Sequence, residues 1–476
     1  MDFGGTINKG MDGVQISGEI QWIEGIITSP DGSTIADLRE DILLTEIVLF
    51  EHIFRSSMSG TLVVTDTMEI ISKFPFMGQE ILTLRFKTPS PQMNELNIAR
   101  DNIGDFLDFT TMRFIINKVP IRGAISNGAQ TYTLHFVSEH GIIDNRKRIS
   151  KSYVKSKSNI GEMVKDLLSN ELGISPRDFH VEPTVGSRSL LVQNVNPTTF
   201  ITRVAREAVS QVSGSPHYVF FSNKNGVHFR TLQDLYKQKP RGLFHAGDIG
   251  PDERIVPKDK DGASGKMIQN YRRILDYTIR NQNDLLVNAR SGMIGGKVIE
   301  HNLFRKRLET TKYNYFSDAD FNKYGRVEAD RSNRVYTDIF KNVPEDEIFN
   351  NRISVLSTSK NSSDHDMFFE QKKTPNPRYK FINDQQSRFT ELEHGVSVEI
   401  TIVGYTSIAV GNLITLNLPT IGGDAATKNV NKLFSGDYLV KTLRHTISPP
   451  LNQHEIKMEV VKDGLQIPIE ADTAVQ

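Results

Sequence analysis

Residues 190 to 232 constrain the fold more than any other stretch, because they predict a helix followed directly by a β-hairpin. Asn196 and Pro197 supply a capping side chain and a fixed φ angle where a helix begins. The apolar residues after them recur with helical spacing and form one stripe, on Phe200, Ile201, Val204, Ala205, Ala208, Val209 and Val212. The helix is predicted to stop at Gly214, which tolerates a left-handed cap, with Pro216 behind it.

The hairpin follows within the same stretch. Two apolar runs, 218–221 and 227–232, flank 223–226, where Asn225-Gly226 can supply the positive φ angles of a tight turn. Upstream, Asn159 and Glu162 have the spacing of a capping box and open an amphipathic helix that ends near Gly173. We expect the two helices to pack together on a small sheet, as an α/β module.

Both ends of the chain read as β structure. Short apolar or alternating runs, separated by Gly, Pro, Ser and Asn, occupy 14–27, 42–54, 61–65, 81–86, 112–119, 131–137, 396–403, 412–418, 438–443 and 454–460. The predicted domains are a first β-barrel at 1–145, the α/β module at 146–235, linking strands with an irregular insertion at 236–385, and a second β-barrel portion at 386–476. The fold class is therefore mostly β (α+β), with two similar barrels and an inserted α/β module. Residues 317–385 are polar and loop-like and receive no assignment.

A weak internal repeat links the two β regions. Gly78-x-x-Ile81 has a counterpart in Gly411-x-x-Ile414, and the spacing of Phe114, Ile116 and Val119 recurs at Tyr438, Val440 and Leu443. If the repeat is real, a trimer whose copies each carry two similar barrels presents six near-equivalent modules. Such a trimer matches a threefold object to a sixfold one.

Several of these segments resemble the baseplate hub proteins of T-even-like phage tails, which share a fold with the spike hubs of other contractile injection machines. The resemblance covers about two thirds of the chain and leaves out 240–270 and 317–385. It is carried by 196–201 with the helix after it, 220–221, 226–229, 59–66, 73–81, 292–299, 313–316 and 434–445. It implies tube-type barrels and a structural virion protein that joins the tail tube to the central spike.

Composition excludes several classes of protein. Hydrophobic residues make up 38% of the chain, and no apolar run approaches the roughly 20 residues that span a bilayer. The first five residues lack a basic and then apolar pattern, so we expect no secretory signal and assembly in the host cytoplasm. With no cysteine there is no disulfide framework or thiolate site. Because 57 basic residues balance 57 acidic ones, no global field attracts nucleic acid.

The basic run Arg146–Lys157 leaves two interpretations open. Clustered cations with an interleaved Tyr153 can follow a phosphate backbone, whereas such runs are more often solvated links between domains. Histidines such as His135, His228 and His445 lie singly in predicted strands, which favours core or cross-strand roles.

The remaining candidate chemical sites are weaker, and the sequence predicts no catalytic, cofactor or metal site. Gly292–Val298 lacks the phosphate-loop spacing, since Ser291 stands at its first position and Val298 follows Lys297. Asp364-His365-Asp366 has metal-ligand types in a loop-like context. Ser213-Gly214-Ser215 is a helix stop and no nucleophile elbow. An acid and base for glycoside cleavage could come from Asp101, Asp105 and Asp108, but the chain has one Trp to line a sugar cleft.

The sequence thus predicts a non-enzymatic hub of a contractile phage tail, a homotrimer located in the virion baseplate. Its expected partners are the tail tube protein, the central spike protein and the tape-measure protein, with DNA passing through the lumen without specific binding. Two alternatives stay open: a tail-associated cell-wall hydrolase, and the spike hub of a secretion-type injector. A hub is inert toward peptidoglycan, whereas a hydrolase releases soluble fragments from it.

Overall fold

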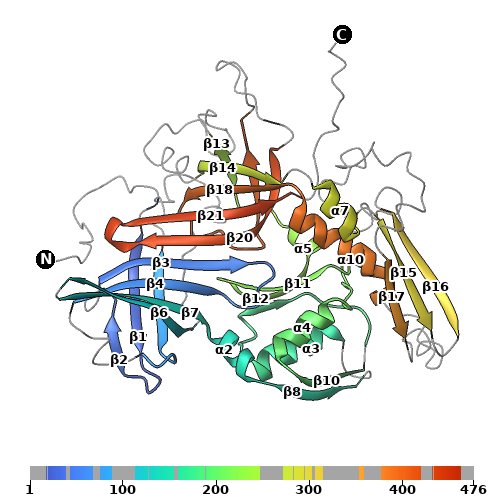
Figure 1. The fold of residues 1–476 in the computed structure, drawn as a ribbon, viewed down its shortest axis with the longest axis horizontal. Helices are drawn as coiled ribbons and strands as arrows, with labels where there is room; N and C mark the ends of the chain where they lie inside the picture. The colour runs from blue at the N-terminus through green and yellow to red at the C-terminus, as the bar shows by residue number, and fades with distance from the viewer. Residues whose placement is uncertain are drawn as a thin grey trace, which may run out of the picture.

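The computed structural model describes residues 18, 20–38, 43–67, 76–87, 113–126, 128–154, 159–187, 189–246, 272–281, 284–293, 295–302, 306–314, 353–358, 377–419, 431 and 434–462. A 13-stranded sheet forms the wall of the molecule, and the helices with three smaller sheets lie to one side of it (Figure 1). None of the described helices has the length and apolar composition to cross a bilayer.

The large sheet draws strands from both ends of the chain. They are β1 (Gln21–Thr28), β2 (Thr34–Asp37), β3 (Leu43–His52), β4 (Ser59–Asp66), β5 (Ile81–Lys87), β6 (Phe114–Ser126), β7 (Ala129–Ser138), β13 (Leu243–Ala246), β14 (Arg273–Asn281), β18 (Ser397–Val403), β19 (Leu413–Asn417), β20 (Gly436–Ser448) and β21 (Gln453–Val461).

The smaller sheets pair β8 (Ile149–Tyr153) with β10 (Leu190–Val195), β12 (Gly226–Thr231) with β11 (Tyr218–Asn223) and β9 (Phe179–Val181), and β15 (Gly295–Asn302) with β16 (Arg307–Asn314) and β17 (Ile353–Thr358). The helices are α2 (Glu139–Arg146), α3 (Ile160–Asp166) with a π-helical continuation at Leu167–Glu171, α4 (Pro197–Ala205), α5 (Leu232–Tyr236), α7 (Leu285–Ser291), α10 (Pro377–His394) and a 3₁₀ turn at Pro449–Leu451.

The second β unit is a closed barrel. Its strands follow the order β14-β18-β21-β20-β19-β13, and a short parallel pairing of β13 with β14 closes the ring. Alternate residues point inward, as the period of a strand requires, so that Val398, Ile400 and Ile402 are fully buried. Tyr438 and Phe244 fill the same core.

The first β unit is built on β3-β4-β7-β6-β5-β1 and has its own core. Phe114 and Phe136 meet edge to face at its centre, with ring centroids 5.2 Å apart. Within the described ranges β1 pairs with β2 and β5, so no pairing there closes this unit into a ring. Instead β3 pairs with β20, which joins the two units into one continuous sheet.

The α/β module follows the sequence prediction at most points. Asn159 caps α3 by accepting a hydrogen bond from the Glu162 amide at 2.8 Å, and the helical segment ends at Gly173 with φ +70°. The strands β11 and β12 form the predicted hairpin, with Asn223 opposite Gly226. The cap of α3 and the hairpin are confirmed, but the turn lies one residue earlier than predicted. Lys224 and Asn225 form the two-residue loop, and of Asn225 and Gly226 only Gly226 has a positive φ angle, +116°.

The predicted extent of the second helix is wrong. The α4 helix begins at Pro197 but ends at Ala205, and Val212 is 77% exposed. The helix does not continue because the backbone of residues 209–211 forms hydrogen bonds with residues 183–185. The Val185 amide donates to the Val209 carbonyl at 2.8 Å, and the Gln211 amide donates to the Pro183 carbonyl at 2.9 Å. A stripe of apolar residues continues past the helix, since Ala208 and Val209 are buried in this extended segment as well.

Two regions that were expected to be irregular contain regular structure. In the basic run, Ile149–Tyr153 forms β8, so that part is a strand and no link; residues 155–158 lie outside the described ranges. Within 317–385 the structure places β17 and the start of α10. The sequence pattern did not indicate α10 because most of the residues it buries are polar, namely Asn383, Gln385, Ser387, Arg388, Thr390 and Glu391, with Leu392 as a buried apolar one. The fold class, mostly β with an inserted α/β module, is confirmed.

Candidate functional site

The two β units repeat one pairing scheme. Taken in chain order, β1, β3, β4, β5, β6 and β7 correspond to β13, β14, β18, β19, β20 and β21. The pairs β3–β4, β4–β7, β5–β6 and β6–β7 recur as the antiparallel pairs β14–β18, β18–β21, β19–β20 and β20–β21. The pair β1–β5 recurs as β13–β19, antiparallel in the first unit and parallel in the second.

The irregularities of the ladders recur too. The β6–β7 ladder shifts register between Ile116 and Lys118, and the β20–β21 ladder shifts between Val440 and Thr442. Likewise β3 shifts against β4 between Leu44 and Glu46, and β14 shifts against β18 between Ile274 and Asp276. Bulges are specific local features, so their recurrence at corresponding positions is strong support for a duplicated unit.

The pairing also tests the predicted sequence repeat. The recurring bulge aligns Ile116 with Val440, so Phe114 and Tyr438, each two residues earlier, occupy the same position. Phe114 pairs with Leu82, and Tyr438 pairs with Ile414. The predicted alignment of Gly78-x-x-Ile81 with Gly411-x-x-Ile414 is one residue out of register. In the structure Ile414 corresponds to Leu82 and not to Ile81. Both Gly78 and Gly411 adopt φ +84°, which explains why a glycine precedes each strand.

A buried side chain accepts hydrogen bonds from the loop that precedes β5, and another does so in the loop that precedes β19. The Glu80 carboxylate accepts hydrogen bonds from the amides of Met77 at 2.5 Å, Gly78 at 3.0 Å and Gln79 at 3.1 Å. At the corresponding place, the side-chain oxygen of Asn412 accepts from the Ala409 amide at 2.9 Å. In both units the bond reaches back three residues, so the two loops are built alike. The correspondence of Glu80 with Asn412 was not predicted from the sequence, because the two residue types differ.

A buried polar contact ties the α/β module to both β units. The Glu51 carboxylate on β3 accepts from the Val410 amide at 2.9 Å and from the Lys224 amide at 3.2 Å. Asn223 donates to the Val410 carbonyl at 2.8 Å, and the Lys224 ammonium donates to the Thr406 carbonyl. Burial raises the pKa of Glu51 to about 7, although the Val410 amide and the Lys224 cation act to lower it. Three distant parts of the chain meet here.

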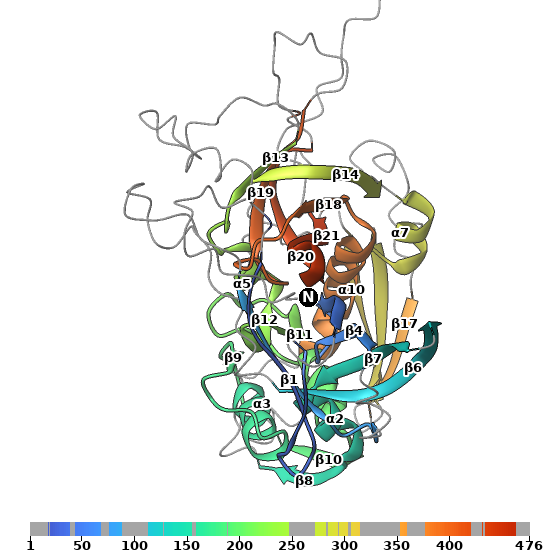
Figure 2. The same ribbon diagram turned by 90° about the vertical axis from the view of Figure 1, so that its left-hand side faces the viewer.

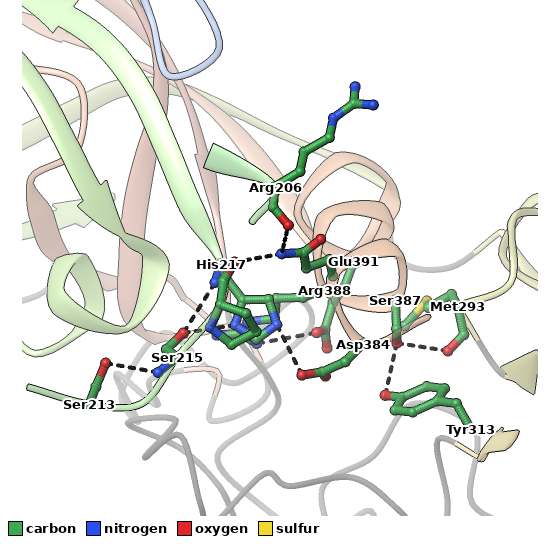
Figure 3. Close-up of polar contacts among 12 residues, drawn as sticks. Arg206, Ser213, Ser215, His217, Met293, Tyr313, Asp384, Ser387, Arg388 and Glu391 are labelled. Carbon is green, nitrogen blue, oxygen red and sulfur yellow. Dashed lines mark hydrogen bonds and ion pairs between the residues drawn. The ribbon is translucent and has the colours of Figure 1, made fainter. Parts of the chain in front are cut away.

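A Ser-His-Asp group lies beside α10 and invites a comparison with serine hydrolases (Figure 3). The Ser215 hydroxyl lies 2.9 Å from Nδ1 of His217, and Nε2 of His217 lies 3.3 Å from the Asp384 carboxylate. In a catalytic triad the serine contacts Nε2 and the acid contacts Nδ1, which is the reverse. Ser215 is moreover 0% exposed, so no substrate reaches its hydroxyl.

The same group instead fastens α10 to the α/β module. The Gln385 amide donates to the carbonyls of Pro216 at 2.8 Å and Arg206 at 3.1 Å. Two residues further along α10, Ser387 donates to the Met293 carbonyl at 2.8 Å and lies 3.2 Å from the Tyr313 hydroxyl (Figure 3). The polar side chains of α10 therefore connect the α/β module to the β15–β17 sheet through hydrogen bonds.

The other candidate residues do not assemble into a site. Asp101, Asp105, Asp108 and Asp364–Asp366 lie outside the described residues. Of 292–298, the part from Gly295 is strand β15, paired on both sides. Among the described residues no group of three or more His, Asp or Glu is placed to hold a metal ion.

Acids pair with two of the described cations of the basic run, Lys147 and Lys151, whereas Arg146 and Arg148 are exposed. Lys147 pairs with Glu171 at 2.8 Å, and Lys151 pairs with Asp166 at 2.5 Å. The Tyr153 hydroxyl donates to the same Asp166 carboxylate at 2.7 Å, and its ring is buried and stacked on Phe200, so the ring is not available to stack on a base. This arrangement favours a structural role for 147–153.

The single histidines occupy strands as predicted. His228 stacks on Phe221 with ring centroids 4.9 Å apart and bonds the Asn223 side chain through Nε2 at 2.9 Å. His445 lies on β20, buried, 3.0 Å from Nε2 of His454 on β21. His135 lies half-buried on β7, opposite Thr61 and Lys118.

The described structure thus has two equivalent β units joined edge to edge, with buried polar contacts between its parts. No family model matches the chain. The fold is similar to that of the 43 kDa tail protein of prophage MuSo2 from Shewanella oneidensis, with a TM-score of 0.50 at 8% identity over 92% of this chain and 98% of that one. A tail protein from Neisseria meningitidis matches with a TM-score of 0.46 at 10% identity, over 94% and 98% of the two chains.

In sequence the chain is similar to the probable baseplate hub protein gp334 of Vibrio phage KVP40. The two are 24% identical over 345 residues, which is 70% of this chain and 72% of the relative. In sequence and in fold this chain is similar to bacteriophage baseplate hub and tail proteins, and the baseplate relative implies a location in the tail of a virion. The predicted resemblance is confirmed, and so is the prediction of a structural protein in place of an enzyme, because these relatives are tail and baseplate proteins.

Proposed function

We propose that three copies of this chain form a ring that seats a threefold spike on a sixfold tail tube. The observation that carries the proposal is the repeated ladder with its two repeated bulges, one of them at Ile116–Lys118 and Val440–Thr442. Three copies of a chain with two equivalent units present six similar modules, and a threefold ring can thereby contact a sixfold tube at every module.

The proposal includes the partners and the place of assembly. The tube-facing side binds the tail tube protein, the opposite side binds the central spike protein, and the lumen admits the tape-measure protein and DNA without sequence-specific contacts. Assembly takes place in the host cytoplasm. Subunit contacts of an obligate ring usually bury more than about 2,000 Å². The curated relative is a phage protein, which favours a phage particle over a secretion-type injector.

The proposed domain division is 1–145, 146–235, 236–385 and 386–476. Separate clusters of buried residues support the first two parts, one around Leu62 and Phe136 and one around Leu168 and Phe229. The third part lends β13 and β14 to the barrel of the fourth, so these two parts share one core.

Mass measurement of the purified full chain in solution tests the proposal. We expect a species of three times 53.7 kDa at micromolar concentration. The same sample, incubated with purified peptidoglycan, should release no soluble fragments, whereas a muramidase run beside it should. A monomer at every concentration would overturn the ring, and fragment release would favour the cell-wall hydrolase.

A further inference from the structure

We propose that the exposed edge of β6 pairs, antiparallel, with the exposed edge of β14 from a second copy, and that this contact repeats the β20–β3 junction within one chain. The inference rests on the proposed ring and names the contact that closes it.

The template for this contact is the way β20 divides its edge between two partners. Residues Gly436–Leu439 pair with β19, and residues Thr442–Ile447 pair with β3 of the first unit. The other edge of β20 pairs with β21 along its length. The second half of β20 is thus the element that joins one β unit to the next.

In the first unit β6 has the same length and the same beginning. Phe114 and Ile115 pair with β5, and the opposite edge pairs with β7. In the described part of the chain, the edge of β6 that faces β5 has no strand partner beyond Ile115. Every residue from 117 to 124 is exposed. This half of β6 corresponds to the half of β20 that contacts β3.

The matching edge belongs to β14, which corresponds to β3. The strand β3 lies between β4 and β20, whereas β14 lies between β18 and the short strand β13. The β13 pairing covers Arg273 and Ile274 alone. The rest of that edge, residues 275–281, has no ladder partner in the described part of the chain. It is the edge that a β20-like strand would occupy.

The position of the two edges suits a ring. Consecutive neighbours run β14-β18-β21-β20-β3-β4-β7-β6, which puts the two edges at opposite ends of one sheet. Figure 1 shows β14 above and β6 with β7 below along the same wall, and Figure 2 shows the same separation from the side. A contact between opposite ends is head-to-tail, and it forms a closed ring when the rotation between copies closes.

The chemistry of both edges fits a covered contact. Three large apolar residues are exposed there: Val119 at 37% and Ile121 at 61% on β6, and Leu275 at 55% on β14. Natural proteins seldom leave apolar edge strands open, because they recruit other chains. Pro120, which lacks an N–H, lies where β6 is bulged between Lys118 and Ile121, a place where a ladder tolerates proline.

The template also gives the register. Ile121 pairs with Thr133 on β7, and Arg444 pairs with Lys457 on β21, and these two pairs occupy the same position in the two units. Because the β6 bulge contains one extra residue, Ile121 corresponds to Arg444 and each later residue of β6 is matched in step with it. Thr446, which pairs with Val48, then corresponds to Gly123; Val48 corresponds to Thr278. Gly123 of one copy should therefore lie opposite Thr278 of the next.

Disulfide trapping tests this register cleanly, because the chain has no native cysteine. Directly opposed residues in an antiparallel ladder have Cα atoms about 4.5–5.5 Å apart, within the range that a disulfide bridges. Under mild oxidation the full chain with Gly123→Cys and Thr278→Cys should give a covalent trimer on a non-reducing gel. The matched control, Lys118→Cys with Thr278→Cys, is five residues out of register and should stay at least tenfold less cross-linked.

The outcomes separate the two proposals. A variant that is trimeric by mass but no better cross-linked than the control would overturn the β6–β14 contact and leave the ring intact. A monomeric wild-type chain would overturn both. Should the cysteine variants fail to fold, amide hydrogen exchange on the wild-type trimer decides: residues 119–124 and 275–281 should be protected like β3 and β20, and rapid exchange there would overturn the contact.

Discussion

At the scale of single residues, the buried pair His445 and His454 contributes to the response of the fold to acid. Burial lowers the pKa of both rings, that of His445 well below its usual value and that of His454 to about 3, with the Lys224 cation acting in the same direction. Both rings are therefore neutral in the folded protein at pH 5 to 7. In the unfolded chain a histidine takes up a proton near pH 6.5.

Stability should therefore rise with pH between about 3 and 6.5. In this window the unfolded state binds more protons than the folded state, and each buried histidine adds up to about 1.4 kcal/mol per pH unit to the slope. Urea unfolding at pH 4.5, 5.5 and 7.5 measures this slope. His454→Gln should flatten it, and His394→Gln, at the exposed end of α10, is the control against which it is compared. Equal slopes in all three proteins would contradict the assignment.

A second residue-scale prediction concerns the start of α4. The Asp144 carboxylate accepts hydrogen bonds from the Thr198 amide at 2.8 Å and the Thr198 hydroxyl at 2.6 Å. Asp144→Ala should lower the free energy of unfolding by about 1–2 kcal/mol, as the loss of a helix cap does. Asp31→Ala is the control, because Asp31 makes the same pair of bonds to Ser33 in an exposed turn and should cost less. Thermal melts of the two variants compare them.

The same residues show what the sequence could and could not predict. Asn196 and Pro197 mark the start of α4, because the fixed φ of proline acts locally. The Asn196 side chain, however, donates to the carbonyls of Asp144 and Lys147, and the capping oxygen comes from Asp144. These bonds join residues 49 and 52 positions apart, and no local sequence pattern indicates them.

At the scale of elements, the prediction is that the two loop fastenings act alike. Glu80→Ala leaves three amides without their acceptor, and Asn412→Ala leaves one. Each variant should lower the free energy of unfolding by about 1–3 kcal/mol, because Asn412→Ala leaves the buried Ala409 amide without a partner and Glu80→Ala removes three hydrogen bonds to a carboxylate. Gln79→Ala, at an exposed neighbouring position, is the control. If Glu80→Ala lowers the free energy of unfolding, measured by chemical denaturation, no more than this control does, the Glu80 hydrogen bonds do not stabilise the fold.

The elements that periodicity predicted well are those with an apolar face. The β11–β12 hairpin and α3 follow from alternation, helical spacing and turn residues. The α10 helix did not follow, because it buries Gln385 and Ser387 against carbonyl groups of other segments. Helices held by polar contacts carry no apolar stripe, so the signal that could have found α10 was its length of uninterrupted helix-compatible residues from 377 to 394.

At the scale of the whole molecule, the decisive contact is between strands that lie some 400 residues apart. The β3–β20 pairing joins the two β units, and the Glu51–Val410 bond lies beside it. The sequence indicated a repeat through Phe114 and Tyr438 but gave no sign of which edges meet. Edge pairing depends on where two strands end up in space, and that is fixed only once both units have folded.

The most direct test of the account is a three-dimensional reconstruction of the purified full chain by electron microscopy, calculated without imposed symmetry. The account predicts a threefold ring whose wall shows six β modules of nearly the same shape, with like contacts within and between copies. A solitary globular particle would contradict it, as would a ring whose modules alternate between two unrelated shapes.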